Sequence, residues 1–216
     1  SQIEHKCVLE SARYLERNGF DVTYLPVQKD GLVLPIDLEK SIRKDTGLVS
    51  IMTVNNEIGV IQPIPELSKI CQKHGIWMHT DAAQAFGKIP IDVSKTGVNL
   101  MSLSGHKIHG PKGIGALYIG NRPRVRLVPV IHGGGQERGM RSGTLAVPLC
   151  VGFGKAAEIA HHEMKFDTPY IEKLGKYLIE RVQKEIPSVI VNGSVEAGKR
   201  FFGCVNISFD SVEGES

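Results

Sequence analysis

Residues 48–79 read LVSIMTVNNEIGVIQPIPELSKICQKHGIWMH, and this stretch decides the fold. It begins with an apolar, β-rich run, Leu48–Val54. A proline then starts a helix over Pro65–Lys73, Gly75 ends it, and a second short apolar run follows at Ile76–His79. A strand, a helix and a strand in this order predict a βαβ unit.

The flanking segments continue this alternation. Leu100–Leu103 and Ala116–Ile119 predict two further buried strands, and the N-terminal segments predict a helix, a short strand and a short helix over residues 6–18, 21–25 and 37–44. We therefore expect an α/β fold in which helices cover both faces of a mostly parallel sheet.

The pattern changes beyond residue 148. Two helical patterns, Pro148–Met164 and Tyr170–Glu185, precede two short strand-like runs, Val189–Val191 and Cys204–Phe209. These elements indicate the start of a second, smaller α+β domain. We place the boundary near residue 160, which gives one domain over residues 1–160 and another over residues 161–216.

Composition excludes several classes of protein. The 216 residues are 41% hydrophobic and 23% charged, as in an ordinary globular protein. The net charge of +3 and the scattered basic residues do not indicate nucleic-acid binding. No apolar run approaches the roughly 20 residues of a membrane-spanning helix, so we expect no membrane partner. The cysteines form no C-x-x-C pair, which argues against a zinc site or a disulfide framework; Cys71 and Cys150 are expected to be buried in helices.

Polar residues gather where three predicted strands end. The first strand runs into Asn55-Asn56-Glu57, the second into Thr80-Asp81-Ala82-Ala83-Gln84, and the third into Ser104-Gly105-His106-Lys107. Ligands bind beyond the carboxyl ends of the strands in an open parallel sheet. We therefore expect these polar side chains to converge on one site.

The sequence around Lys107 allows three interpretations: a surface residue, a point charge that binds phosphate, or an amine that forms a Schiff base. The loop's two glycines have the spacing of a Walker A motif, but Pro-Lys-Gly (111–113) stands where that motif needs Lys and Ser or Thr. The H-x-x-H pair at His106 and His109 lacks acidic or thiol ligands nearby, and the lysine between them would repel a metal ion. We expect no metal site.

A pyridoxal cofactor needs an amine for its aldehyde, a carboxylate for its ring nitrogen and donors for its phosphate. Lys107 offers the amine, Asp81 the carboxylate, and Ser104 and His106 the donors. Asp81 could equally cap a helix, since Ala-Ala-Gln follows it. The residues alone favour the Schiff base and leave the other interpretations open.

The motifs resemble those of the cysteine desulfurases, enzymes of the class V aminotransferase group with fold type I that use pyridoxal 5'-phosphate (PLP). The resemblance runs along the whole chain and rests on these stretches: EHKCVL (4–9), TVNNEIGVIQPI (53–64), HTDAAQAFGKIPIDV (79–93), LMSLSGHKIHGPKGIGALYI (100–119), HGGGQERGMRSGT (132–144) and NISFDSVEGES (206–216).

The resemblance implies a role for each matching position. Lys107 would hold the cofactor aldehyde and move a substrate proton, and Asp81 would pair with the ring nitrogen. Gln84 would bond the ring hydroxyl, and Asn56 would lie near the same edge and meet the substrate. His5 would stack on the ring.

Three further positions would bind the cofactor phosphate. Ser104 and His106 would do so within one subunit, and Thr144 would reach the phosphate of the second subunit of a homodimer. The implied cofactor is PLP and the implied substrate is L-cysteine.

The implied reaction removes sulfur from L-cysteine, leaving L-alanine and a persulfide on the enzyme for iron-sulfur cluster assembly. The family's persulfide cysteine lies beyond the VEGES motif (212–216), and a glycine/threonine phosphate loop precedes the EHK motif. We therefore expect the central portion of such an enzyme, with both domains incomplete, and no turnover by this portion alone. A non-catalytic interaction subunit of the same fold, or another class V lyase such as a selenocysteine lyase, is the alternative.

A run of arginines suggests protein partners. Arg122, Arg124 and Arg126 would, by resemblance, face an acidic surface on a frataxin-like protein or an iron-sulfur scaffold protein. An accessory subunit is implied as well. Arg141 would lie near the substrate carboxylate or the subunit boundary. The motifs look most like those of the mitochondrial branch, so we expect the mitochondrial matrix, with the bacterial cytoplasm as the alternative.

Overall fold

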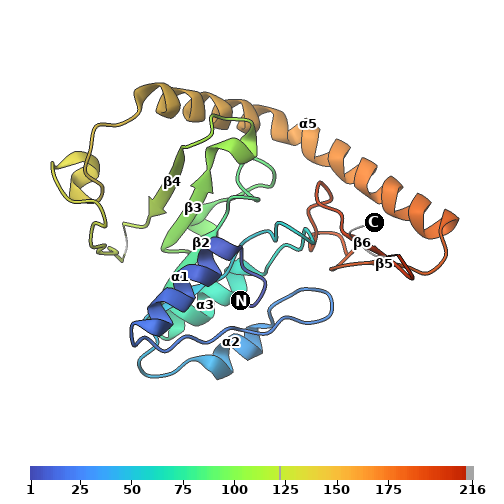
Figure 1. The fold of residues 1–216 in the computed structure, drawn as a ribbon, viewed down its shortest axis with the longest axis horizontal. Coiled ribbons are helices and arrows are strands. Elements are labelled where there is room, and N and C mark those ends of the chain that lie inside the picture. Colours follow the sequence, from blue (N-terminus) through green and yellow to red (C-terminus); the bar gives the residue numbers. More distant parts are fainter. Residues whose placement is uncertain (122, 213–216) are drawn as a thin grey trace.

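The computed structural model describes residues 1–121 and 123–212. Its main sheet has four strands in the order β1-β2-β3-β4 (Figure 1). The first three run parallel and β4 runs antiparallel to β3. The helix α3 (Ile64–Lys73) joins β1 to β2, which confirms the predicted βαβ unit and the mostly parallel sheet. The strands are β1 (Leu48–Ser50), β2 (Trp77–Asp81), β3 (Leu100–Ser104) and β4 (Gly115–Ile119).

The remaining elements surround this sheet and extend beyond it. Before β1 lie α1 (Lys6–Arg17) and α2 (Pro35–Ser41), and α4 (Val93–Thr96) precedes β3. The expected strand over residues 21–25 is absent among the described residues, because this segment's backbone makes one hydrogen bond, from the Gln2 N–H to the Leu25 carbonyl, and no ladder. After β4 come η2 (Gln136–Gly139), α5 (Val147–Glu185), and the antiparallel pair β5 (Val189–Val191) and β6 (Ile207–Phe209).

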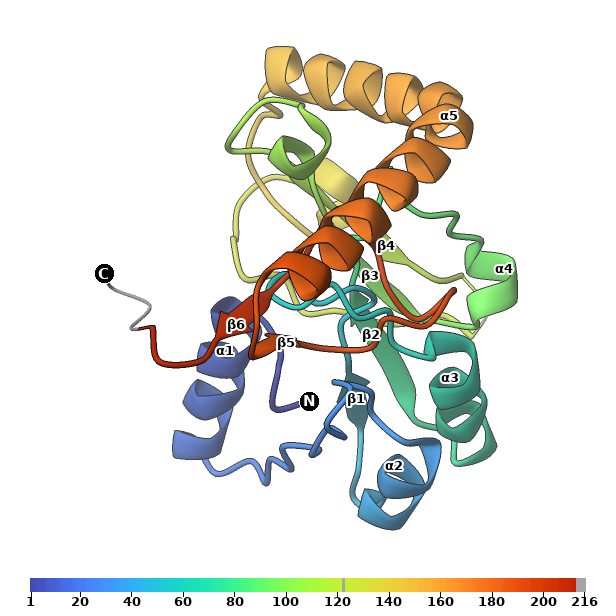
Figure 2. The same ribbon diagram turned by 90° about the vertical axis from the view of Figure 1, so that its right-hand side faces the viewer.

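One long helix replaces the two predicted in the C-terminal part. The α5 helix continues between residues 164 and 170, where the sequence pattern separated two helices, and it contains Pro169. Proline lacks an N–H for the helical ladder and its ring crowds the preceding turn, which bends a helix without necessarily ending it. Figure 2 shows α5 changing direction along its length. Because α5 passes residue 160 without interruption, the domain boundary there stays a prediction.

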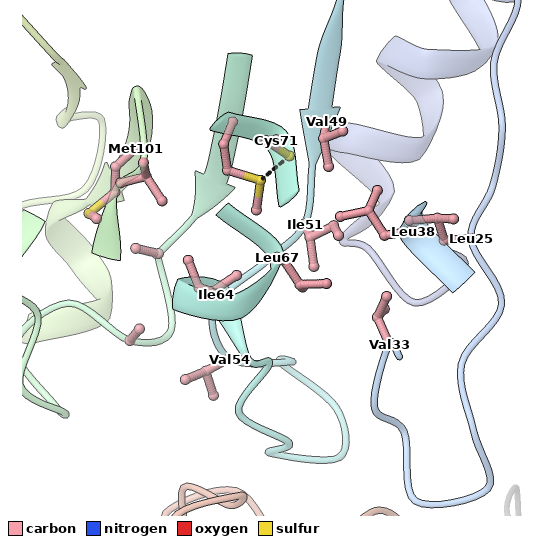
Figure 3. Packing of buried hydrophobic residues seen from close by; sticks show 14 of the residues in the cluster. Leu25, Val33, Leu38, Val49, Ile51, Val54, Ile64, Leu67, Cys71 and Met101 are labelled. Atoms are coloured by element: carbon pink, nitrogen blue, oxygen red, sulfur yellow. Dashed lines mark hydrogen bonds between the residues drawn. The ribbon is translucent and has the colours of Figure 1, made fainter. Parts of the chain in front are cut away.

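The core lies between the sheet and α3. This helix buries Ile64, Leu67, Ser68 and Cys71, positions spaced three and four apart that share one face. Cys71 is fully buried, as expected, with its Sγ 3.8 Å from Sδ of Met78 (Figure 3). Cys150 is only half-buried. Within the described part of the chain, no helix is long and apolar enough to cross a membrane.

The segment that follows β1 is tied to the C-terminal part. The Phe201 N–H donates to the Gly59 carbonyl at 2.8 Å, and Val60 forms an antiparallel bridge with Arg200. Gly59 has φ +70°, and a Cβ there would lie 2.5 Å from the Cys204 carbonyl oxygen and 2.9 Å from that of Phe201. Only glycine permits both this backbone conformation and this close approach.

Candidate functional site

The register of the sheet brings two predicted site residues to one edge. Asp81, the last residue of β2, pairs with Ser102, two residues before the end of β3 at Ser104. Side chains alternate between the faces of a strand, so His79 and Asp81 share a face with Ser102 and Ser104. Met78, on the other face, is fully buried in the core. The predicted convergence of strand ends is thus present for β2 and β3.

His79 ties the three parallel strands together beneath this edge. Its Nδ1 lies 2.7 Å from Ser50 Oγ and its Nε2 lies 2.9 Å from Ser102 Oγ. Burial lowers the pKa of His79, and the neighbouring carboxylates of Asp81 and Glu4 oppose that shift. The imidazole therefore favours its neutral form, which can accept at one nitrogen and donate at the other.

Asp81 has one oxygen engaged and one free. Its Oδ1 accepts the Ala83 N–H at 2.8 Å, which shapes the turn after β2, as expected of an aspartate that caps a turn. Among the described residues no donor meets Oδ2. The side chain is largely buried, with 9% of the residue exposed. A buried carboxylate with one open oxygen can accept one strong hydrogen bond from a ligand.

Lys107 is held by a tight, glycine-flanked turn. It lies in η1 (Gly105–Ile108), directly after β3, and its buried neighbours Gly105 and Ile108 anchor the turn. The Gly110 N–H donates to the Gly105 carbonyl at 3.0 Å, which closes the loop. The Lys107 side chain is exposed, and its Nζ has no hydrogen bond or ion pair with any described residue. Ser104 Oγ lies 3.2 Å from Nδ1 of His106 at the start of the same turn.

His5 caps the N-terminus of α1, two residues before Cys7. Its Nδ1 accepts the Cys7 N–H at 3.2 Å and lies 3.0 Å from Cys7 Sγ. A main-chain N–H can only donate, so this nitrogen carries no proton and a proton on Nε2 faces outward. Burial raises the pKa of the Cys7 thiol, and the Asp81 carboxylate adds to the rise.

The two neighbouring asparagines differ in what they are free to do. The Asn55 side chain donates to the Ile3 carbonyl at 2.8 Å and accepts the N–H groups of Glu57 and Ile58 at 2.9 and 2.8 Å. Asn55 therefore shapes the turn. The Asn56 carbonyl accepts from Cys204 Sγ at 3.4 Å, while its side-chain amide has no partner among the described residues. This pattern agrees with the choice of Asn56 as the candidate ligand-binding amide.

Thr144 lies apart from the other candidates. It is exposed on the long arm between β4 and α5, which also carries η2 (Figure 1, left), and no hydrogen bond joins it to a described residue. Several apolar side chains of the same arm are exposed as well, including Val128 at 85%, Val130 at 93% and Ile131 at 51%. Within one copy of the chain, Thr144 does not complete the site.

A cavity of about 590 Å³ lies on the far side of Lys107, between η1 and α5. Lys88 lines this cavity together with Lys107, whereas Asp81 and Gln84 do not, so the cavity borders the candidate site and does not coincide with it. Lys88 Nζ donates to Oε1 of Gln84 at 2.8 Å. Sequence reasoning missed Lys88. Its four-residue spacing from Gln84 was the available clue.

Comparison with known proteins indicates the family of the chain. The Aminotransferase class-V family model matches residues 1–216. The chain belongs to the class-V aminotransferase family. A mitochondrial cysteine desulfurase of Candida albicans is 59% identical to this class-V aminotransferase chain over 216 residues, which cover 100% of the chain and 44% of the relative. The predicted resemblance to cysteine desulfurases is therefore confirmed.

Solved structures support the fold class of this class-V aminotransferase chain. A NifS-like protein superposes with a TM-score of 0.92 at 42% identity, covering 100% of the chain and 58% of that protein. The structure of SspA in complex with cysteine superposes with a TM-score of 0.77 at 45% identity, covering 89% of the chain and 53% of that protein. The chain spans about half the length of the proteins it matches.

The residues present fit PLP, the cofactor that the resemblance implies. The Lys107 amine and the Asp81 Oδ2 are unpaired among the described residues and belong to neighbouring strand ends. The exposed His5 ring belongs to the segment before α1, where the Asp81 carboxylate acts on the neighbouring Cys7 thiol. An amine, a carboxylate and a flat aromatic side chain are what the aldehyde, the ring nitrogen and the ring face of PLP require.

Proposed function

We propose that the gene product containing this chain is a PLP-dependent cysteine desulfurase and that the chain forms the central part of its active site. One observation carries the proposal: an unpaired amine, Lys107, and an open carboxylate oxygen, on Asp81, follow adjacent parallel strands at one edge of the sheet. A buried aspartate with a purely structural role would be expected to have partners for both of its oxygens.

Bound PLP would supply an aldehyde that condenses with amines and a ring that withdraws electrons from the substrate Cα. The chain's own residues have three tasks. Asp81 Oδ2 accepts a hydrogen bond from the ring nitrogen and keeps that nitrogen protonated. Lys107 Nζ, when neutral, takes the proton from the substrate Cα. His5, by the resemblance, would pack its ring against the cofactor.

The hydrogen-bonding groups around these residues would orient the ligand. Asn56 and Gln84 offer amides near the ring hydroxyl, and Ser104 and His106 offer donors for the phosphate at the start of η1. The product of the reaction is L-alanine, and the sulfur passes to a cysteine thiolate of the enzyme. Cysteine as substrate is favoured over selenocysteine because the related SspA was solved with cysteine bound.

The same proposal includes a homodimer. The arm between β4 and α5 exposes apolar side chains and carries Thr144 away from the site of its own copy. A second copy packed against this arm would bury those side chains and could receive Thr144 at its phosphate site. The domain boundary near residue 160 also remains part of the proposal.

We place the gene product in mitochondria, because the Candida albicans relative is a mitochondrial protein. Arg124 and Arg126 are exposed and would face an acidic partner, such as an iron-sulfur scaffold or frataxin-like protein; an accessory subunit is proposed on the resemblance alone. Arg122, the first of the three predicted arginines, lies outside the described residues, as do residues 213–216 of the VEGES motif.

Chemical trapping tests the proposal. The natural gene product is mixed with PLP, reduced with borohydride and digested, and mass spectrometry should find the pyridoxyl group on Lys107. Lys112→Ala is the matched control, because Lys112 is an exposed lysine of the same loop. Lys107→Ala should abolish trapping and Lys112→Ala should not. A pyridoxyl group on another lysine would overturn the assignment.

Product analysis separates the candidate reactions. The wild-type gene product given L-cysteine should form alanine and an enzyme persulfide. Turnover of selenocysteine with no turnover of cysteine would instead support the other class V lyase. Cofactor binding without turnover of either amino acid would support the non-catalytic subunit.

A further inference from the structure

We infer that Lys88 is a positioning residue that fixes the Gln84 amide with its N–H donors turned toward the ring hydroxyl of the cofactor. The inference rests on the proposed function and adds to it a residue to which neither the motifs nor the comparisons assign a role. Its basis is the contact between Lys88 Nζ and Gln84 Oε1 at 2.8 Å.

The chemistry of this contact decides the orientation of the amide. A protonated lysine has three donors and no acceptor, so it can meet only the oxygen of a carboxamide. The Gln84 Oε1 atom is therefore held toward Lys88 and the NH₂ group points away from it. No described residue accepts a hydrogen bond from this NH₂ group, so both of its N–H donors remain available to a ligand.

Lys88 is itself fixed by its surroundings. Its side chain is half-buried and its Nζ lies 5.6 Å from the centre of the Phe201 ring, within the range of a cation–π contact. Its main-chain carbonyl accepts a hydrogen bond from Thr168 Oγ1 of α5 at 2.9 Å. Lys88 therefore connects the turn that carries Gln84 with α5 and with the C-terminal segment.

The turn that carries both residues packs tightly against η1. Gly87 has φ +73°, and a Cβ there would lie 2.7 Å from Ile108 Cγ2 and 3.0 Å from Ala160 Cβ. Only a residue without a side chain fits at position 87, between η1 and α5. The distance between Gln84 and the Lys107 turn is thus set by packing, which gives the Lys88 contact a rigid frame.

No described carboxylate neutralises the positive charge of Lys88 by direct contact. Burial lowers its pKa and repulsion from Lys107 lowers it further, while the Cys204 thiol acts in the opposite direction. No described carboxylate forms an ion pair with Lys88 Nζ. The other charged or titratable groups that line the neighbouring cavity are His109, Lys155, Glu163 and Asp167. The Gln84 oxygen is therefore the hydrogen-bond partner that the described structure provides for this ammonium.

The expected consequence is electrostatic. The ring hydroxyl of PLP carries negative charge when ionised, and N–H donors from Gln84 stabilise that anion. Protonation of the bound cofactor, which changes its visible absorbance, then requires a lower pH. If the amide is free to turn its oxygen toward the ring, that stabilisation is lost and the midpoint of the absorbance change moves to higher pH.

The test is a pH titration of cofactor absorbance in the holoenzyme of the natural gene product. Lys88→Met keeps the apolar stem but removes the donor, and it should raise the midpoint by about 0.5 to 1 pH unit, the effect of about one hydrogen bond. Lys88→Arg keeps the charge and the donors, so its midpoint should rise by no more than half as much as that of Lys88→Met. Lys155→Met is the matched control, because Lys155 lines the same cavity but pairs with Glu158 at 3.1 Å; its midpoint should not move.

A double-mutant cycle shows whether Lys88 acts through Gln84. Gln84→Ala should raise the midpoint by itself, and adding Lys88→Met to it should raise the midpoint no further. Equal shifts from Lys88→Met in both backgrounds would overturn the inference, since the lysine would then act by its charge alone. An unchanged midpoint in Lys88→Met or in Gln84→Ala would also overturn it.

The controls distinguish this failure from failure of the proposed function. Wild-type protein that binds no PLP, or binds it away from Lys107, refutes the proposed function and the inference with it. Wild-type protein that binds PLP at Lys107 but shows no coupling between Lys88 and Gln84 refutes the inference alone. If Lys88→Met does not fold, Gln84→Ala and Lys88→Leu provide the same comparison.

Discussion

Gly59 provides the most direct test of how the candidate site is held in place. Its φ is +70°, and a side chain has no room there, because a Cβ would lie 2.5 and 2.9 Å from two carbonyl oxygens. Replacing it with alanine costs about 1 to 2 kcal/mol for the left-handed backbone and about 1 to 3 kcal/mol for the forced displacement of packed atoms. We expect Gly59→Ala to lower the free energy of unfolding by about 2 to 5 kcal/mol in total.

Gly75 is the matched control for the backbone contribution. It has φ +68° at the end of α3, but a Cβ there would meet nothing within 4 Å. Gly75→Ala should therefore cost only about 1 to 2 kcal/mol. Urea unfolding of the two variants of the natural gene product, followed by far-ultraviolet circular dichroism, measures both losses. Equal losses would refute the steric argument and leave only the backbone contribution.

The Gly59 substitution should also affect the site. The displaced backbone lies three residues from Asn56, whose carbonyl meets Cys204. We expect Gly59→Ala to bind PLP several-fold more weakly than Gly75→Ala, as measured by titration of cofactor absorbance. Identical PLP affinities would show that the contact between this turn and the C-terminal segment does not position Asn56.

Three further predictions follow from buried groups. Burial holds the pKa of His79 below its ordinary value of 6.5, so below that pH the unfolded chain binds a proton that the folded chain does not. The free energy of unfolding should therefore be highest above pH 6.5 and fall at lower pH by up to about 1.4 kcal/mol per pH unit. Urea titrations of His79→Gln should lack this dependence. Arg200, 3% exposed, donates to three carbonyls, so Arg200→Met should destabilise by about 3 kcal/mol or more, and a loss below about 1 kcal/mol would contradict this. Burial raises the pKa of Cys71 to about 11, so iodoacetamide at pH 8 should label Cys7 first and Cys71 only after unfolding, as mass spectrometry would show.

Local patterns were sufficient to predict the central sheet. The apolar run at residue 48, the proline-started helix and the run at residue 76 each contain their own start and stop residues, and β1, α3 and β2 formed there. Pairing partners are not encoded locally. The run at residues 21–25 has strand-forming residues but no neighbouring strand within the described residues, and it remained irregular. The sequence pattern separated two helices between residues 164 and 170, but one helix continues there through Pro169, because a proline can be accommodated by a bend.

Some residues of the candidate site could be predicted from local patterns, and others could not. Asp81, Ser104 and Lys107 follow predicted strands directly, so the parallel topology was enough to bring them to one edge. The positions of His5 and Asn56 depend on contacts between distant segments, and the sequence motifs alone suggested them. The spacing of Lys88 from Gln84 was the only local clue, because its contacts with Phe201 and Thr168 join segments far apart in the chain.

The outer strands of the four-stranded sheet have a practical consequence. Within the described residues, β1 and β4 each pair with a strand along one side only. Their other sides are open to a further strand, apart from the Ser50 carbonyl, which accepts from the N-terminal amine at 3.5 Å. Leu48 on β1 and Leu117 on β4 are exposed by 53% and 47%. Edge strands of this kind can pair with an extended peptide, so we expect these 216 residues, produced alone, to self-associate as their concentration rises. Laboratory work on the chemistry is best done with the complete gene product.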